Sequence, residues 1–226
     1  MTGEARPAFY ALRPGAWRDY VTLLHPPYTL WHLSYVAIGA SLAPHLSWGR
    51  LGWTALAFFL AMGIGAHALD ELNGRPLRTR IPSPVLVALA TASIASACAI
   101  GVAVAADSTW WLLAFVAFGA AIVVAYNLEL LDGFFHTDMW FALSWGAFPL
   151  LTAYFASAER LRAEAVAAAG FAFLASLAQR TLSTEVRFAR RAAADPGSAR
   201  PAETALKLLA AALPLLAGAL LLSRSG

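Results

Sequence analysis

Three side chains that could bind a metal ion lie close together near the end of an apolar stretch. His67, Asp70 and Glu71 are spaced i, i+3 and i+4, so on a helix they share one face. Hard carboxylate oxygens grouped in this way suit Mg²⁺, which commonly takes one or two protein carboxylates and leaves room for phosphate. We therefore predict His67, Asp70 and Glu71 as metal ligands.

A cluster of arginines follows this acidic pair: Arg75, Arg78 and Arg80. Guanidinium groups bind phosphate through two parallel hydrogen bonds, so an acid pair beside several arginines predicts a site for a metal and a diphosphate. The alternative is structural. In that case Asp70 and Glu71 pair with Arg75 and Arg78, and the arginines only set the orientation of the chain in a membrane.

A second group of acids and arginines lies in the segment 185–203. We expect this segment on the same side of the membrane as the loop 70–84, where the two would clamp a diphosphate from both sides. We therefore predict Glu185 and Asp195 as further metal ligands and Arg187 as a diphosphate ligand. The alternative is a solvated loop that contacts anionic lipid.

The segment 128–138 is acidic, on a side that we expect to carry basic residues. Tyr126 and Asn127 end the predicted helix before it, and Glu129 follows them. We predict Tyr126 and Asn127 as contacts to the substrate, and Glu129 as a metal or substrate contact. The alternative is a plain surface turn.

Helices that span a membrane must position these groups, because the composition excludes an ordinary soluble domain. Hydrophobic residues make up 60% of the chain and charged residues 13%, against about 25% charged residues in a typical globular domain. Several charge-free runs reach the roughly 20 residues that cross the bilayer core as a helix. We predict an all-α fold, a polytopic transmembrane bundle of seven helices in one integral membrane domain, 1–226. The expected helices are 28–44, 50–70, 84–106, 109–128, 139–158, 164–184 and 204–223.

The orientation follows from the distribution of Lys and Arg. One side consists of the N-terminal segment 1–24 and the loops 70–84, 128–138 and 185–203, the last with its flank up to Lys207, and it carries 11 of these residues, against 4 on the other side. Because basic residues accumulate in cytoplasmic loops, we predict a multi-pass protein of the inner cell membrane with a cytoplasmic N-terminus. The single cysteine, Cys98, lies inside an apolar run, which excludes an intrachain disulfide.

Five segments carry a family resemblance. A basic residue and prolines precede Thr29 and a run of small apolar residues, and Arg-Pro-Leu follows the His67–Glu71 group. The segments are 20–40, 63–77, 126–127, 143–154 and 185–203. Over about residues 20–200 the chain resembles the UbiA-type prenyltransferase superfamily in these segments.

The resemblance implies a UbiA-like fold and the transfer of an isoprenyl group from a prenyl diphosphate to an aromatic or lipid acceptor. It implies Asp70 and Glu71 as the catalytic carboxylates, which hold Mg²⁺ together with Glu185. Arg75 and Arg78 would then bind the diphosphate. The metal would neutralise the departing diphosphate, and aromatic faces would stabilise the allylic cation.

Two other functions are compatible with the sequence. A non-catalytic UbiA-like protein would bind a lipid or isoprenoid, or assist a partner, without depending on Mg²⁺. A small transporter would need ionisable residues at mid-membrane, and the chain has few besides Arg180 and His32. The expected partners are the lipid bilayer and an isoprenyl diphosphate, with no nucleic acid. The sequence leaves the oligomeric state open.

Overall fold

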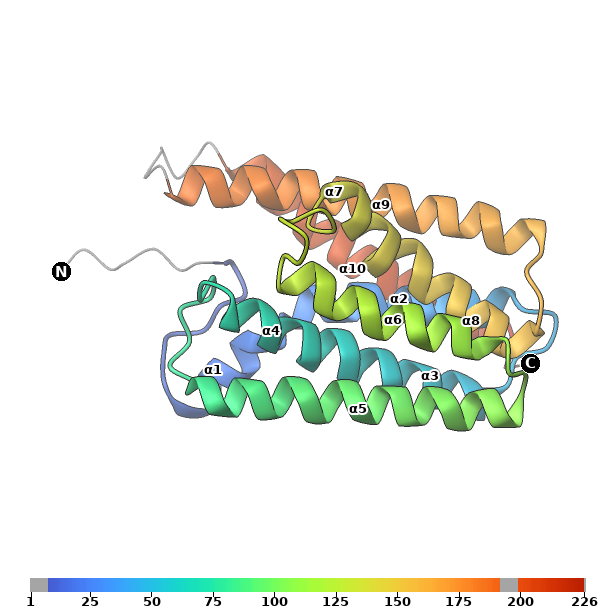
Figure 1. The fold of residues 1–226 in the computed structure, drawn as a ribbon. Helices are drawn as coiled ribbons and strands as arrows, with labels where there is room; N and C mark the ends of the chain where they lie inside the picture. Colours follow the sequence, from blue (N-terminus) through green and yellow to red (C-terminus); the bar gives the residue numbers. More distant parts are fainter. Residues whose placement is uncertain (1–7, 192–198, 226) are drawn as a thin grey trace.

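The apolar runs of the sequence form long helices along one common axis in a computed structural model of the protein (Figure 1). The structure describes residues 8–191 and 199–225. Two long helices contain π-helical segments, so their parts carry separate labels. The elements are α1 (Ala16–Leu23), α2 (Pro26–Leu42), α3 (Trp48–Phe58), η1 (Phe59–Ala66), α4 (His67–Leu72), α5 (Ser83–Asp107), α6 (Leu112–Asn127), α7 (Asp138–Phe141), η2 (Ala142–Ala147), α8 (Phe148–Ala158), α9 (Ala163–Arg191) and α10 (Arg200–Leu222).

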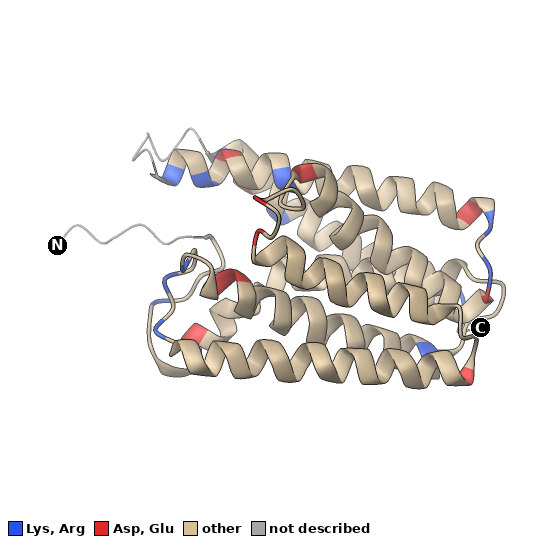
Figure 2. Cartoon of the chain, in the orientation of Figure 1, with Lys and Arg blue, Asp and Glu red and all other residues tan. Residues whose placement is uncertain are grey.

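The predicted all-α bundle is confirmed. With the interrupted helices counted as continuous, the described residues form seven long helices besides the short α1. Five are long and apolar enough to cross a membrane, namely Trp48–Leu72, Ser83–Asp107, Asp138–Ala158, Ala163–Arg190 and Arg200–Leu222. Charged residues gather toward the two ends of the bundle and leave most of its middle uncharged (Figure 2). The architecture is that of a multi-pass membrane protein.

The largest difference from the predicted bounds lies at the end of α9. The prediction ended this helix at residue 184, whereas α9 continues to Arg191 and α10 begins at Arg200. Glu, Ala and Arg favour helix, and the buried Val186 holds the extension against the bundle. Glu185 and Arg187 therefore lie on a helix, and the polar connection is shorter than expected.

Local signals in the sequence explain several helix starts. Pro26 and Pro27 occupy the first turn of α2, where a missing N–H group costs little. Ser47 Oγ accepts a hydrogen bond from the backbone nitrogen of Arg50 at 3.3 Å and caps α3. Thr137 Oγ1 caps α7 by accepting from the backbone nitrogen of Trp140, also at 3.3 Å.

The core is built around α2, which packs against α8, α9 and α10. Trp31 and Tyr35 are fully buried on α2, and Trp31 Nε1 donates to Tyr35 Oη at 2.6 Å. Ser176 Oγ of α9 donates to the same Tyr35 oxygen at 3.2 Å. Gly39 lets the backbones of α2 and α8 touch, because a Cβ atom there would overlap the carbonyl oxygen of Leu150.

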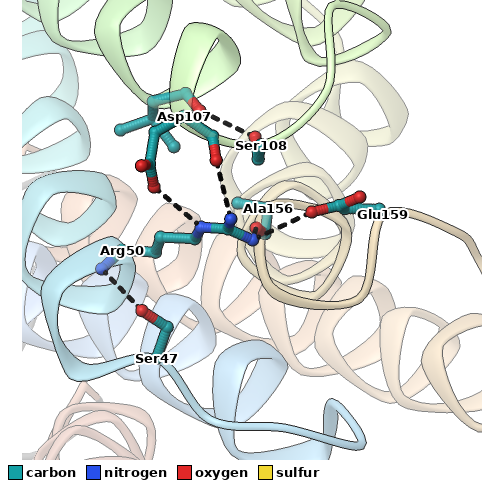
Figure 3. Close-up of polar contacts among 7 residues, drawn as sticks. Ser47, Arg50, Asp107, Ser108, Ala156 and Glu159 are labelled. Atoms are coloured by element: carbon teal, nitrogen blue, oxygen red, sulfur yellow. Dashed lines mark hydrogen bonds and ion pairs between the residues drawn. The ribbon is translucent and has the colours of Figure 1, made fainter.

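Arg50 ties three helices together at the end of the bundle that carries the C-terminus (Figure 3). Its Nε donates to the Asp107 carboxylate at 3.1 Å, and one terminal nitrogen donates to the Asp107 carbonyl at 2.8 Å. The other terminal nitrogen donates to the Ala156 carbonyl at 3.2 Å and to the Glu159 carboxylate at 3.1 Å. These bonds fix the start of α3 against the ends of α5 and α8.

Candidate functional site

Polar side chains gather around Asp70 at the other end of the bundle. They come from the segment before α1, the start of α2, α4, the end of α6 with the loop that follows it, and α9. We call this group the Asp70 cluster. Its members are Tyr10, His25, His67, Asp70, Tyr126, His136, Arg180 and Arg187. The side chains of His136, Glu71, Arg187 and Arg180 lie close enough to interact electrostatically with the Asp70 carboxylate.

Two histidine rings stack at the centre of the cluster. The ring centroids of His25 and His67 lie 3.9 Å apart, with an angle of 11° between the planes. His67 Nδ1 lies 3.1 Å from the carbonyl oxygen of Gly63. Because a carbonyl oxygen only accepts, Nδ1 of His67 carries a proton, and in the neutral ring Nε2 is an acceptor.

Tyr10 reaches His25 from the N-terminal segment, with Tyr10 Oη 2.9 Å from His25 Nδ1. Burial lowers the pKa of His25 well below its ordinary value, and the neighbouring His67 and Arg187 lower it further. Burial also raises the pKa of Tyr10 well above its ordinary value. Both groups are therefore uncharged at neutral pH.

Tyr126 forms the opposite wall of the cluster, where α6 ends. Its ring stacks on His136, with centroids 4.5 Å apart, and His136 Nδ1 lies 3.0 Å from the carbonyl oxygen of Tyr126. Arg180 lies beside this wall. Its Nε donates to the Asp138 carboxylate at 2.9 Å, and its guanidinium lies 5.5 Å from the ring centroid of Phe141.

Several buried polar atoms in and below the cluster lack a hydrogen-bond partner among the described residues. They are His25 Nε2, His32 Nδ1, Tyr126 Oη, Ser144 Oγ and Gln179 Oε1. His32, Tyr126, Ser144 and Gln179 are each less than 5% exposed. Buried polar groups are normally paired, so a set of five in neighbouring helices indicates a place for water or for a polar ligand.

Backbone irregularities border the same region. The π-helical segment η1 ends directly before His67, and η2 begins directly after Phe141. Segments of this kind occur frequently at functional sites. His25 has φ +47° and ψ +53°, a left-handed conformation that is unfavourable for a residue other than glycine.

Glu71, predicted as a metal ligand next to Asp70, is engaged elsewhere. The residue is fully buried, and its carboxylate accepts hydrogen bonds from the backbone nitrogens of Leu77, at 3.0 Å, and Thr79, at 2.7 Å. The hydroxyl of Thr79 donates to it at 2.8 Å. Glu71 therefore holds the loop after α4 in place.

The predicted diphosphate ligands of this loop are directed to other contacts or to the surface. Arg75 donates to the carbonyl of Ile81 at 2.6 Å and to Ser83 Oγ at 2.8 Å. Arg78 and Arg80 are exposed. The backbone nitrogen of Arg80 donates to the buried carboxylate of Asp19 at 3.0 Å, which fastens the loop to α1.

Two further predicted site residues, Asn127 and Glu185, also lie outside the Asp70 cluster. The Asn127 amide donates to the Val123 carbonyl within its own helix, at 2.7 Å. Glu185 is exposed, and its sequence spacing puts it on a different face of α9 from Arg180 and Arg187. Asp195 lies outside the described residues. Across 8–191 and 199–225, no three His, Cys, Asp or Glu side chains form a group that could hold a metal ion.

An apolar cavity lies between α3, α5, α6 and α8. The space enclosed by its walls is about 90 Å³, and these walls carry small and aromatic side chains together with Cys98. Val123 and Trp145 line it. Tyr126 follows Val123 by about one helical turn, and its ring centroid lies 4.5 Å from that of Trp145. The cavity therefore begins where the Asp70 cluster ends.

The structure thus brings together four residues that the sequence singled out: His67, Asp70, Tyr126 and Arg187. Sequence reasoning did not assign Tyr10, His25, His136 or Arg180 to the site. An arginine in an apolar run is a usable signal for Arg180, because buried charge in a membrane is expensive. No sequence signal identifies Tyr10, which arrives from a polar segment 15 residues before its partner His25.

Comparisons of the chain with protein-family models, with curated proteins and with solved structures gave no match. The assignment of function therefore depends on the geometry of the Asp70 cluster and the cavity beside it.

Proposed function

We propose that this protein binds an isoprenyl diphosphate, with the diphosphate at the Asp70 cluster and the isoprenyl chain in the apolar cavity. The observation that carries the proposal is the junction of the two at Tyr126 and Trp145. Arg180 and Arg187 supply positive charge for the anionic end. The enclosed space of about 90 Å³ is smaller than the roughly 300–1,000 Å³ of common ligand sites, so the isoprenyl chain would extend through the open side of the cavity. From the distribution of Lys and Arg we assign this end to the cytoplasmic side of the inner membrane.

We infer that the bound diphosphate is a prenyl donor, as the resemblance to the UbiA-type superfamily implies. The bond between the first carbon of the isoprenyl chain and the diphosphate oxygen breaks, and the oxygen keeps the electron pair. A nucleophilic atom of an aromatic or lipid acceptor then bonds to that carbon and releases a proton. The aromatic faces of Phe58 and Phe148, which line the cavity, would stabilise the allylic cation.

Magnesium fits this proposal as an ion that arrives with the diphosphate. The Asp70 carboxylate makes no hydrogen bond or ion pair with another described residue. Mg²⁺ commonly binds one or two protein carboxylates together with substrate phosphates, so Asp70 is the residue that would hold it. Bound there, the ion would neutralise charge on the departing diphosphate.

A second candidate is a non-catalytic protein that binds the isoprenoid or lipid without magnesium. One observation favours it: both oxygens of the Glu71 carboxylate are engaged by Leu77 and Thr79, which leaves Asp70 as the single acid of the cluster. This candidate requires the same junction of polar cluster and apolar cavity. It differs in predicting binding that is independent of Mg²⁺ and yields no product.

Thermal unfolding of the detergent-purified protein tests the proposal. We expect isoprenyl diphosphates with Mg²⁺ to stabilise the fold by about 2.7 kcal/mol at 100 times the dissociation constant. A panel of geranyl, farnesyl and geranylgeranyl diphosphate, each with and without Mg²⁺, separates the two candidates. Inorganic diphosphate and farnesol, which each carry one half of the ligand, serve as controls. No shift with any chain length would contradict the proposal.

A further inference from the structure

We propose that His25 is a ligand-binding residue whose Nε2–H donates to the anionic head group, and that Tyr10 is the positioning residue that fixes this proton on Nε2. This assignment rests on the proposed function, since it names two further residues of the same site. It starts from one atom: His25 Nε2 is buried and has no hydrogen-bond partner among the described residues.

The hydrogen bond to Tyr10 determines which ring nitrogen carries the proton. The described residues offer one acceptor for the Tyr10 hydroxyl, His25 Nδ1 at 2.9 Å. If His25 donated instead, the hydroxyl proton would have no acceptor among the described residues and the buried Nε2 lone pair would have no donor, and this arrangement would cost free energy. Donation by Tyr10 satisfies both groups of this bond. The neutral ring then carries its proton on Nε2.

Ring stacking and the backbone conformation hold the ring of His25 in place, in addition to the hydrogen bond with Tyr10. One face stacks on His67 at 3.9 Å. The backbone holds a left-handed conformation at φ +47°, directly before Pro26. Strain of this kind persists where the surrounding structure enforces it, and it concentrates at ligand sites. A donor held this rigidly loses little entropy when it binds an oxygen.

The positive charge of the site lies near the same atoms. The charge of Arg187 acts on both His25 and Tyr10, and it also acts on Asp70. A head-group oxygen that is attracted by Arg187 would therefore lie close to His25, whose Nε2 has no partner among the described residues. An anionic oxygen accepts the N–H of a neutral imidazole and satisfies it.

Binding measurements on variants at residue 25 test the assignment, with farnesyl diphosphate as the probe. We expect His25→Leu to weaken binding about tenfold to a hundredfold, because a hydrogen bond to a charged oxygen is lost. His25→Gln carries an amide N–H near the position of Nε2 and should stay within about threefold of the wild type. The two variants lose the ring stacking and meet the same backbone strain. His45→Leu changes an exposed histidine at the opposite end and should leave binding unchanged.

A second measurement reads the proton directly and needs no ligand. In protein labelled with ¹⁵N at its five histidines, we expect His25 to show a protonated Nε2, and Tyr10→Phe to shift the ring toward the other tautomer. Tyr10→Phe should weaken binding about fivefold. A wild-type His25 protonated on Nδ1, or equal binding by the wild type and His25→Leu, would overturn the assignment. Failure of the wild type to bind farnesyl diphosphate at all would overturn the proposed function, and the assignment with it.

Discussion

Replacing Gly39 with alanine is expected to destabilise the bundle by about 3 kcal/mol or more, because backbone rather than a movable side chain occupies the space. The added Cβ would overlap the Leu150 carbonyl oxygen and lie 2.9 Å from the carbonyl carbon. To relieve this overlap, α2 and α8 must separate along the centre of the core. Thermal unfolding in detergent and the monodisperse fraction in size-exclusion chromatography measure the effect.

Gly170 provides the matched control for this prediction. It lies on α9, and a Cβ atom there meets nothing within 4 Å. Alanine favours helix more than glycine, so Gly170→Ala should change the stability by no more than about 1 kcal/mol, in the favourable direction. Equal stability of Gly39→Ala and the wild type would show that α2 and α8 are not packed as described.

The Asp70→Asn variant is expected to lose Mg²⁺-dependent stabilisation by isoprenyl diphosphates, and to lower turnover about a hundredfold or more. Asparagine keeps the size of the side chain and removes the charge that would hold the ion. The measurements are thermal unfolding with and without Mg²⁺ and the release of diphosphate in the presence of an acceptor. Unchanged magnesium dependence and unchanged turnover would contradict the transferase proposal.

Two other acids separate binding from folding in this experiment. Glu71→Gln should destabilise the protein by about 1–3 kcal/mol with or without ligand, since an amide cannot accept all the hydrogen bonds of the buried carboxylate. Glu185→Gln changes an exposed side chain on another face of α9 and should alter neither property. Loss of ligand stabilisation in Glu185→Gln, at unchanged stability, would return that residue to the site.

The helices could be predicted because their signal is local. A run of about 20 apolar residues in a chain with few charges has few alternatives to a membrane helix, and prolines and polar loops mark its ends. The predicted and observed bounds agree within a few residues for α5 and α10. At α9 the prediction failed locally, because charged residues end an apolar run without ending a helix.

The site could be predicted only in part, because its members meet through contacts between distant segments. Helical spacing places Asp70 and Glu71 on neighbouring positions, but successive residues point about 100° apart around a helix axis. The loop that follows then folds back on Glu71 and leaves Asp70 to the cluster. Spacing alone does not show which of two adjacent acids a later loop will bind.

The arginines show the same limit. Their number in the loop after α4 suggested a phosphate site, yet Arg75 binds the carbonyl of Ile81 in its own segment. Arg180 and Arg187 are two helical turns apart on α9, so they lie on the same side of the helix, and the charges of both act on Asp70. The stacked pair of His25 and His67 likewise joins residues 42 positions apart, a pairing that only the packing of α2 against the helix containing α4 reveals.

The central claim is that the cavity below the Asp70 cluster takes the isoprenyl chain, and the single cysteine of the protein can test it. Cys98 lines the cavity and is partly exposed. The measurement is its rate of modification by a small membrane-permeant maleimide, with farnesyl diphosphate or with inorganic diphosphate as the control. We predict that farnesyl diphosphate at 100 times its dissociation constant lowers the modification rate to about one hundredth, because about one hundredth of the protein then carries no ligand. Inorganic diphosphate should leave the rate unchanged. An unchanged rate under conditions where farnesyl diphosphate raises the unfolding temperature would contradict the claim.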